Sequence, residues 1–210
     1  MNCDPIARWY RWLEYLGFGR ALERRRNAFL SDVADARRAL VLGDGDGRFL
    51  ARLVRVMHGA IDYVDVSPGM LALARGRAGD GVHYILGDAL TIPLPAREYD
   101  LIVTHFFLDC FNDQDAAALV NKVADAAAPR ARWLISEFRA ASWWSRLCIG
   151  ALYIFFRITT GLQTQRLIDH HSLLRQRGFA IERSETARAG LLTSELWRLD
   201  GLGEWRRLSV

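Results

Sequence analysis

The sequence has 210 residues, of which 51% are hydrophobic and 25% charged, and its formal net charge is +4. This length allows one domain with a sizeable core, and the near-average composition argues against disorder. Arginine is spread along the chain apart from one run at residues 24–26, which is typical of a solvated helix face, so we do not expect nucleic-acid binding.

The cysteines and the apolar runs give no sign of export, metal binding or membrane insertion. Cys3, Cys110 and Cys148 are far apart, with no CxxC and no histidine at ligand spacing, which predicts neither a disulfide framework nor a metal site. The start, MNCDPIARWYRWLEYL, is interrupted by charges and does not resemble a signal peptide. The apolar run at residues 147–156 is shorter than the roughly 20 residues that span a bilayer. We therefore expect a soluble, cytoplasmic protein.

Residues 6–30 have the apolar spacing of two amphipathic helices, separated at GFG (residues 17–19). From residue 38 onward, short apolar runs alternate with helix-like stretches at residues 48–57, 68–77 and 114–128. The runs that predict strands are ALVLG, AIDYVDV, VHYIL, YDLIVTHF and RWLISEF. Because these runs are apolar on both faces and alternate with helices, they predict an α/β fold with a parallel sheet covered on both sides.

The second half of the chain predicts two more helices and a hairpin. Pro129 is expected to end the helix at residues 114–128. A long apolar helix should follow Phe138 to about residue 160, and another should span about residues 166–177 and be capped by Gly178. FAIERSE and LLTSELWRL predict a terminal hairpin at the sheet edge. We divide the chain into an N-terminal helical lid, residues 1–37, and a ligand-binding part, residues 38–210, within one structural domain.

The loop in RALVLGDGDGRFLARL (residues 38–53) carries three glycines and two aspartates between a predicted strand and a predicted helix. An EF-hand loop would need Glu at the twelfth position from Asp44, where Arg55 stands. A P-loop would need Gly-Lys-Ser/Thr after the glycines, and a plain hairpin turn is disfavoured because a helical pattern follows. A nucleoside site remains, since glycines let the backbone turn tightly and approach a ligand.

Two further acids follow the next two predicted strands. Asp65 comes roughly 20 residues after the glycines, where a carboxylate can accept hydrogen bonds from both hydroxyls of a ribose. Asp88 follows the third strand, at the adjoining tip, where it could accept from an adenine amino group. The alternative interpretations are a surface acid at a strand end for Asp65 and an N-cap of the next turn for Asp88.

The motifs VLGDGDGR, VDVSPGML, GDAL, YDLIVTHFFLDCF, WLISEF and RQRGFAIE occur in the order and spacing of class I (Rossmann-like) S-adenosylmethionine-dependent methyltransferases. The chain resembles this family over about residues 38–199. The resemblance implies a seven-stranded, mostly parallel sheet with helices on both faces and the last strand inserted antiparallel. It also implies that residues 38–210 form a methyltransferase domain with S-adenosylmethionine as its cofactor.

Carried over to this sequence, the resemblance implies a role for each loop in holding the cofactor. The glycines would line its methionine and ribose, the acids at the next two strand tips would hold ribose and adenine, and the end of the fourth strand would form the floor near the sulfonium. The residues concerned are Gly43, Asp44, Gly45, Asp46, Gly47, Asp65, Ser67, Met70, Asp88, Ala89, Thr104 and His105. The family often has an acid two residues before the first glycine to help bind the methionyl ammonium. Here that residue is Val41, so Asp44 or Asp46 would have to take the role.

Methyl transfer from a sulfonium needs alignment and sometimes a base that removes a proton from the acceptor. His105 and Asp109, four residues apart after the fourth strand, are the catalytic candidates. Neutral His105 would act as a base near pH 7. The alternative, which we prefer, is that His105 packs on the cofactor and Asp109 caps the helix that follows.

Aromatic residues on the N-terminal helices and on the helix after the fifth strand predict a cover over a hydrophobic or planar acceptor. Quinone-type and lipid-type methyltransferases are similar in placing a hydrophobic helix after a strand that ends like ISEF, and such an acceptor would suit the stretch WWSRLCIGALYIFF. The candidate acceptor-binding residues are Trp9, Tyr10, Tyr15, Phe106, Trp143 and Tyr153. Aromatic stripes are also typical of core packing. The sequence thus predicts a small-molecule acceptor, leaves peripheral contact with a membrane open, and does not fix the acceptor atom or the oligomeric state.

Three other functions stay open on the sequence. One is methylation of arsenite or another thiophile through Cys110 and Cys148, although buried structural cysteine is the commoner explanation. Another is a nicotinamide-dependent oxidoreductase, against which the glycine spacing and SPGML argue. The last is a cofactor-binding module without catalysis, against which the mostly intact pocket motifs argue.

Overall fold

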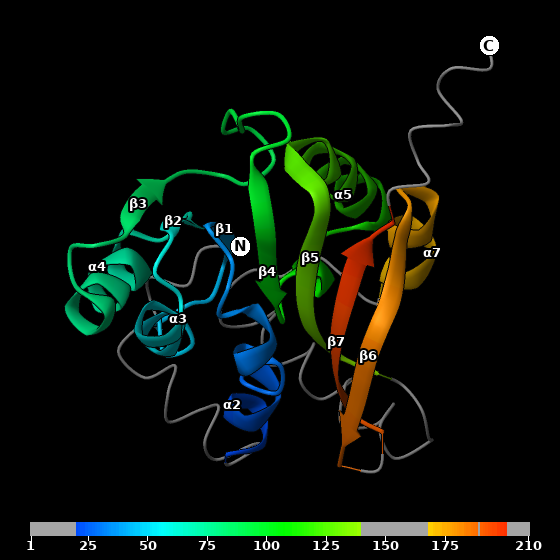
Figure 1. The fold of residues 1–210 in the computed structure, drawn as a ribbon, viewed down its shortest axis with the longest axis horizontal. Coiled ribbons are helices and arrows are strands. Elements are labelled where there is room, and N and C mark those ends of the chain that lie inside the picture. The colour runs from blue at the N-terminus through cyan, green and yellow to red at the C-terminus, as the bar shows by residue number, and fades with distance from the viewer. Residues whose placement is uncertain (1–19, 140–167, 189, 201–210) are drawn as a thin grey trace.

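Within the described residues, seven strands form one sheet in the order β3-β2-β1-β4-β5-β7-β6 (Figure 1). The computed structural model describes residues 20–139, 168–188 and 190–200. The strands are β1 (Arg38–Leu42), β2 (Ala60–Asp65), β3 (His83–Leu86), β4 (Tyr99–His105), β5 (Ala127–Phe138), β6 (Phe179–Ala187) and β7 (Leu192–Leu199). The helical elements are α2 (Ala21–Arg26), η2 (Leu30–Val33), α3 (Leu50–Val56), α4 (Pro68–Ala78), η3 (Leu108–Cys110), α5 (Asp113–Ala126) and α7 (His170–Gln176).

The strand pairing confirms the predicted fold class. Strands β3, β2, β1, β4 and β5 pair in parallel with their neighbours. β7 is antiparallel to both β5 and β6, so the last strand is inserted between them. β6 and β7 form the predicted terminal hairpin at one edge of the sheet. The carboxyl ends of the five parallel strands therefore meet at the same edge, which is where an α/β sheet binds its ligand.

Helices cover both faces of the sheet, and each face has its own apolar core. One core packs α5 and α7 against the strands and includes Trp133 of β5 and Trp197 of β7. The other packs η2, α3 and α4 against the opposite face and includes Leu53, Tyr63 and Val103. Because both faces are covered, the central strands carry apolar side chains on both faces rather than on one.

Local signals in the sequence set several helix boundaries. Ser67 caps α4, since its side chain accepts from the amide of Met70 at 3.1 Å, and Pro68 takes the first turn. Asn112 caps α5 by accepting from the amide of Asp115 at 2.8 Å. Gly178 has φ +84° just after α7 and ends that helix as predicted.

The predicted helix end at Pro129 is wrong. α5 ends at Ala126, and Pro129 lies inside β5, which begins at Ala127. The register between β4 and β5 shifts after Tyr99–Ala127, and Arg130 within the shifted stretch has φ +64°. This irregularity accommodates a proline that cannot donate to the ladder.

The N-terminal lid is described only from residue 20 onward. Its helix α2 ends at Arg26, four residues before the predicted end, and η2 follows. α2 packs against β5 and β7, and the carbonyl of Arg25 accepts from Ser136 and Ser194 at 3.2 and 2.7 Å. The first predicted helix, the GFG break and the predicted helix after Phe138 lie outside the described residues.

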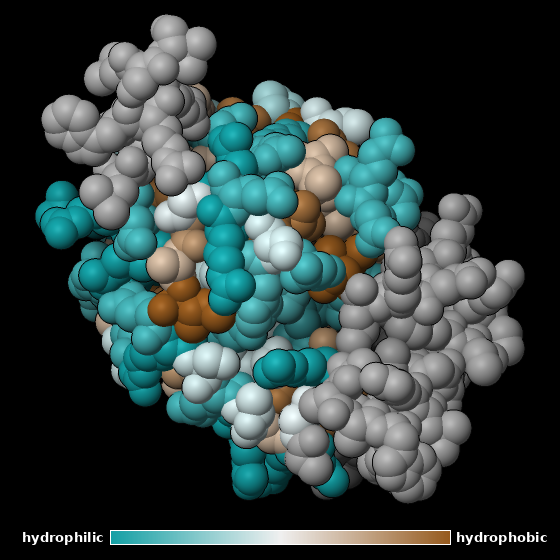
Figure 2. Space-filling model, turned by 90° about the vertical axis from the view of Figure 1, so that its right-hand side faces the viewer, coloured by the Kyte–Doolittle hydropathy of each residue, from teal (hydrophilic) through white to brown (hydrophobic). Residues whose placement is uncertain are grey.

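The hairpin edge of the sheet is polar. Figure 2 views the side on which β6 and α7 lie, and the described residues there are mostly hydrophilic, with hydrophobic side chains in small separate patches. On β6, Glu182 and Arg183 are exposed. Charged side chains of this kind disfavour edge-to-edge pairing. In the part of the chain that the structure describes, no helix is long and apolar enough to cross a membrane.

Candidate functional site

The loops that follow β1 and β3 flank the tip of β2, because a backbone hydrogen bond joins each of them to the end of β2. Gly43 donates to the carbonyl of Val64 at 3.0 Å, and Gly87 donates to the carbonyl of Asp65 at 3.0 Å. After β4, Phe106 donates to the carbonyl of Ser136 at 2.6 Å. The glycine loop and the acidic tips predicted from the sequence are thus brought together at the carboxyl edge of the sheet.

The three glycines of the loop all have a left-handed backbone. Their φ values are +62° at Gly43, +69° at Gly45 and +76° at Gly47, a region that residues with a Cβ rarely adopt. A Cβ at Gly43 would lie 2.2 Å from Cδ2 of Phe107, and one at Gly47 would lie 2.5 Å from Cα of Ala74 in α4. The loop therefore needs glycine for its conformation and for the close approach of neighbouring groups.

The two aspartates of the loop have different partners. Asp44 is buried, and its Oδ2 accepts from the amide of Leu50 at 3.1 Å. Asp46 is also buried and forms ion pairs with Arg48 at 2.9 Å and Arg77 at 2.8 Å. Two arginines therefore already hold the carboxylate of Asp46. Val41, where the family often has an acid, is fully buried in the core beneath α3.

Asp65, Ser67 and Met70 form the junction between β2 and α4. Oδ1 of Asp65 accepts from the amide of Ser67 at 2.9 Å, and Ser67 in turn caps the helix. The Asp65 carboxylate is partly exposed at the strand tip, whereas Ser67 and Met70 are buried. One carboxylate oxygen of Asp65 thus fixes the turn at the predicted ribose position.

Asp88 caps the turn after β3, as the alternative interpretation proposed. Its Oδ1 accepts from the amide of Leu90 at 2.9 Å, and its carbonyl accepts from Thr91 and Ile92. The side chain is exposed, and neighbouring Ala89 is buried. The cap explains one oxygen of Asp88, and the contact of Asp88 with adenine stays a prediction.

Thr104 and His105, at the end of β4, face opposite sides of the sheet. Thr104 Oγ1 accepts from Nε1 of Trp133 at 2.9 Å, within the core under α5. The His105 ring meets Phe49 edge to face at 4.6 Å. Neither ring nitrogen of His105 has a hydrogen-bond partner among the described residues. Burial lowers the pKa of His105 well below its usual range, and the charge of Arg26 lowers it further, so the ring is neutral.

Asp109 does not cap α5, because Asn112 does. Its Oδ1 accepts instead from the amide of Ile168 at 3.0 Å, and it lies beside a second buried carboxyl, Glu137 at the end of β5. Glu137 Oε1 accepts from the amides of Phe107 and Leu108 at 3.1 and 2.9 Å. Burial raises the pKa of both carboxyls, and in Glu137 the neighbouring charge of Asp109 adds to the rise. Two such groups favour holding one proton between them.

An apolar cluster closes this edge of the sheet under α2. It joins Leu22 of α2 to Leu191 and Leu192, with Phe106 and Phe138 packed against it. The rings of Phe106 and Phe138 are 5.1 Å apart, and φ of Phe106 is +53°. The guanidinium of Arg26 lies 5.3 Å above the Phe106 ring. The described part of the lid thus covers the ends of β4 and β5, where an acceptor was predicted.

Comparison with known proteins decides the family. Residues 39–130, which hold the glycine loop and the tips of β2, β3 and β4, match the family described as Methyltransferase domain. Residues 39–130 thus belong to a methyltransferase domain, and the chain has the fold of the class I S-adenosylmethionine-dependent methyltransferases. The family match confirms the resemblance found in the sequence, and with it S-adenosylmethionine as the cofactor of the family.

The curated relatives of the chain include methyltransferases of quinone biosynthesis. It is 29% identical over 127 residues to Ubiquinone/menaquinone biosynthesis C-methyltransferase UbiE of Vibrio vulnificus, covering 56% of this chain and 48% of the relative. It is 32% identical over 128 residues to Demethylmenaquinone methyltransferase of Thermus thermophilus, covering 59% of this chain and 57% of the relative. The chain spans about half the length of the curated relatives it matches.

Solved structures show the same fold at low identity. Magnesium protoporphyrin IX methyltransferase of Synechocystis, with bound S-adenosylhomocysteine, aligns with a TM-score of 0.67 and 16% identity, covering 93% of this chain and 96% of that chain. The N-methyltransferase NodS of Bradyrhizobium japonicum aligns with a TM-score of 0.64 and 15% identity, covering 85% and 87%. The named activities of these neighbours differ, so the shared fold does not select an acceptor.

Some predicted site residues lie outside the described residues, and some residues at the candidate site were not predicted from the sequence. The predicted acceptor residues outside the described part are Trp9, Tyr10, Tyr15, Trp143 and Tyr153, so of that set the structure places Phe106 alone. Three residues at the site that the sequence did not single out are Arg26, Phe107 and Glu137. Glu137 had a readable signal, because an acid directly after the apolar run WLIS lies at the active edge of the sheet.

Proposed function

We propose that the chain transfers a methyl group from S-adenosylmethionine to a small, hydrophobic, quinone-like acceptor. The observation that carries the proposal is the shared edge at which three left-handed glycines and the carboxylates of Asp65 and Asp88 lie on adjacent strand tips. The curated relatives are named as quinone-pathway methyltransferases. The apolar cluster around Phe106 under α2 offers an apolar surface beside that edge.

The residues present fit the cofactor. The left-handed glycines let the loop after β1 turn tightly, and Asp65 brings a carboxylate to the tip of β2 for the ribose hydroxyls. Of the two loop aspartates, Asp44 is the better candidate for the methionyl ammonium, because Arg48 and Arg77 neutralise Asp46. When bound, S-adenosylmethionine supplies a methyl group already activated by its sulfonium.

The remaining task is to orient the acceptor and, for a hydroxylated ring, to take its proton. Burial makes His105 a weak base, since its lowered pKa disfavours the protonated product. The Asp109–Glu137 pair suits the role better, because carboxyls with raised pKa values accept a proton more readily near neutral pH. We therefore propose that this pair removes a proton from the acceptor hydroxyl, which makes the ring a better nucleophile.

The acceptor class is tested by measuring S-adenosylhomocysteine release with reduced quinones, amines and arsenite offered separately. We expect turnover with the hydroquinone and none with the amine. Turnover with arsenite that is lost on Cys110→Ser would favour the thiophile alternative. Binding of S-adenosylmethionine without turnover on any of these acceptors would favour a binding module and contradict the proposed function.

The proton-accepting role is tested with Asp109→Asn and Glu137→Gln. We expect either change to lower kcat by about 10²–10⁴, the usual contribution of a general base, while the affinity for S-adenosylmethionine stays within about twofold. The wild-type kcat should also fall at low pH, where the pair is fully protonated. Asp113→Asn, an exposed acid at the start of α5, is the matched control. Unchanged kcat in folded Asp109→Asn and Glu137→Gln would show that alignment alone suffices.

A further inference from the structure

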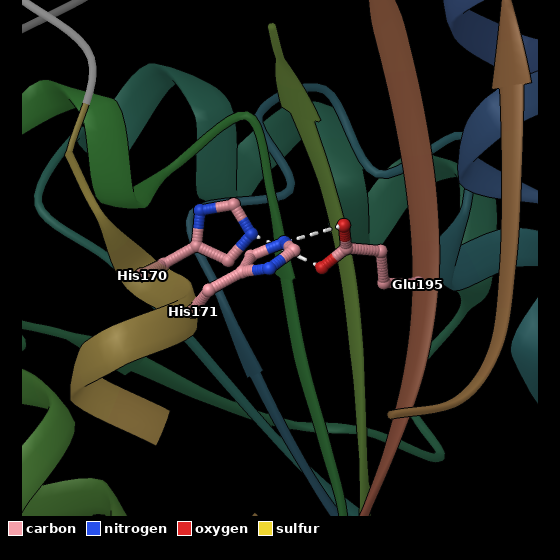
Figure 3. Close-up of side chains that lie close together, drawn as sticks. All are labelled: His170, His171 and Glu195. Carbon is pink, nitrogen blue, oxygen red and sulfur yellow. Dashed lines mark hydrogen bonds and ion pairs between the residues drawn. The ribbon is translucent and has the colours of Figure 1, made fainter. Parts of the chain in front are cut away.

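Three ligand-type groups come together where α7 meets β7, namely those of His170, His171 and Glu195. His170 and His171 open α7, and Glu195 lies on β7 (Figure 3). Nε2 of His170 lies 3.1 Å from Oε2 of Glu195, and Nε2 of His171 lies 2.8 Å from Oε1. Neighbouring residues of a helix normally point in different directions, yet both rings converge on one carboxylate.

The three groups have the chemistry of a transition-metal site. Two imidazoles and one carboxylate form a ligand set that Zn²⁺ takes in proteins, with water in the fourth position. The three candidate ligand atoms all lie within 4.8 Å of one another. Ligands of a tetrahedral Zn²⁺ at about 2.0–2.1 Å lie roughly 3.3 Å apart, so small side-chain rotations would suffice. Each ring would bind through Nε2 as the neutral tautomer that carries its proton on Nδ1.

The surroundings also suit a bound ion. Nε1 of Trp197 donates to Oε2 of Glu195 at 2.9 Å, a contact that orients the carboxylate as outer-shell partners of metal sites do. The His171 ring packs edge to face on Trp197 at 5.2 Å and on His170 at 4.7 Å. The side chains of Glu195 and His170 are buried, whereas that of His171 is 32% exposed. An ion can therefore enter from solvent past His171.

We propose that His170, His171 and Glu195 bind a divalent transition-metal ion, Zn²⁺ in the first place, that fastens α7 to β7. A seven-residue helix such as α7 has little stability of its own, so a link to the sheet would hold it in place. Strands β4 and β5 separate β7 from β1, so the ion lies away from the glycine loop, and the amide of Ile168, just before α7, joins this part of the fold to Asp109. In the alternative state without a metal, His170 and His171 each form a hydrogen bond to the carboxylate of Glu195.

The two states are distinguished by titrating the full chain, free of any histidine tag and stripped with a chelator, with ZnCl₂ in a calorimeter. We expect one Zn²⁺ per chain and a rise in Tm on addition. His171→Ala, at the most exposed of the three positions, should weaken Zn²⁺ binding at least tenfold and abolish the Tm rise. Glu195→Gln should do the same. His58→Ala, an exposed histidine after α3, is the matched control and should leave both unchanged.

The proposal is overturned if 100 µM Zn²⁺ neither binds nor raises Tm. It is equally overturned if His171→Ala binds Zn²⁺ as tightly as the wild type, because the ion would then sit elsewhere. Circular dichroism of His171→Ala without metal shows whether that variant is folded. If Glu195→Gln does not fold, the comparison then relies on His171→Ala. The experiment needs neither S-adenosylmethionine nor an acceptor, so its outcome is independent of the proposed methyl transfer.

Discussion

At the scale of single residues, the position of His105 was predicted from the sequence, whereas its lowered pKa follows from the fold. It stands at the end of β4 beside Phe49, buried and neutral, with neither ring nitrogen bonded to any described residue. Its position in THFFLDCF was readable from the sequence. Its burial was not, because it depends on Phe49 and Arg26, which come from other parts of the chain.

The lowered pKa of His105 should make stability depend on pH. In the unfolded chain His105 takes up a proton below about pH 6.5, whereas in the folded chain it stays neutral, so the unfolding free energy falls as the pH drops through that value. The raised pKa values of Asp109 and Glu137 act in the opposite sense. The contribution of His105 to the unfolding free energy of the wild type should therefore fall when the pH is lowered from 7 to 5. His105→Leu lacks the titrating ring, so we expect it to lose about 1–2 kcal/mol less stability than the wild type over the same range. Parallel denaturation profiles for the two proteins would contradict this.

Asp65 is the residue whose loss should most affect the cofactor. Asp65→Ala removes the carboxylate at the tip of β2, and we expect binding of S-adenosylmethionine to weaken by about 1–3 kcal/mol, which is roughly 5-fold to 150-fold. Asp80→Ala, an exposed acid after α4, controls for the change in charge. Calorimetric titration measures both. An unchanged dissociation constant in Asp65→Ala would mean that the ribose lies elsewhere.

At the scale of elements, most strands and helices were predicted from the sequence. The predictions were wrong where a residue's place depends on a second element that lies far away in the sequence. Pro129 reads as a helix breaker, yet the irregular register beside Tyr99 lets it lie in β5. Asp109 reads as a cap of α5, yet Asn112 takes that place and Asp109 turns to Ile168. In both cases a contact with a distant segment overrides a sound local rule.

The glycine loop and α4 offer a paired test at this scale. Gly47→Ala combines a left-handed φ of +76° with a contact 2.5 Å from Cα of Ala74, so we expect it to lower the unfolding free energy by more than about 1 kcal/mol. Gly76→Ala, within α4 and with no atom within 4 Å of the added Cβ, should raise it by about 0.5–1 kcal/mol. Urea denaturation compares the two. Equal effects would show that the loop is not conformationally restricted.

At the scale of the whole molecule, the order of motifs along the chain was enough to predict the sheet and its inserted last strand. It could not predict side-chain clusters built from distant segments. Glu195 lies 24 residues from His171, and Glu137 lies beside Asp109 only because β4 and β5 are neighbours in the sheet. Spacing in the sequence can reveal a set of ligands that lies within one helix or loop. The clusters around Glu195 and Glu137 form only when α7 and η3 pack on the sheet.

The central claim is that the carboxyl edge of β1, β2 and β3 binds S-adenosylmethionine. The measurement that tests it most directly is a calorimetric titration of the wild-type chain with S-adenosylmethionine and, separately, with NAD. We predict one site per chain for S-adenosylmethionine, displaced by S-adenosylhomocysteine, and no binding of NAD at the same concentrations. Tight binding of NAD without any binding of S-adenosylmethionine would contradict the account.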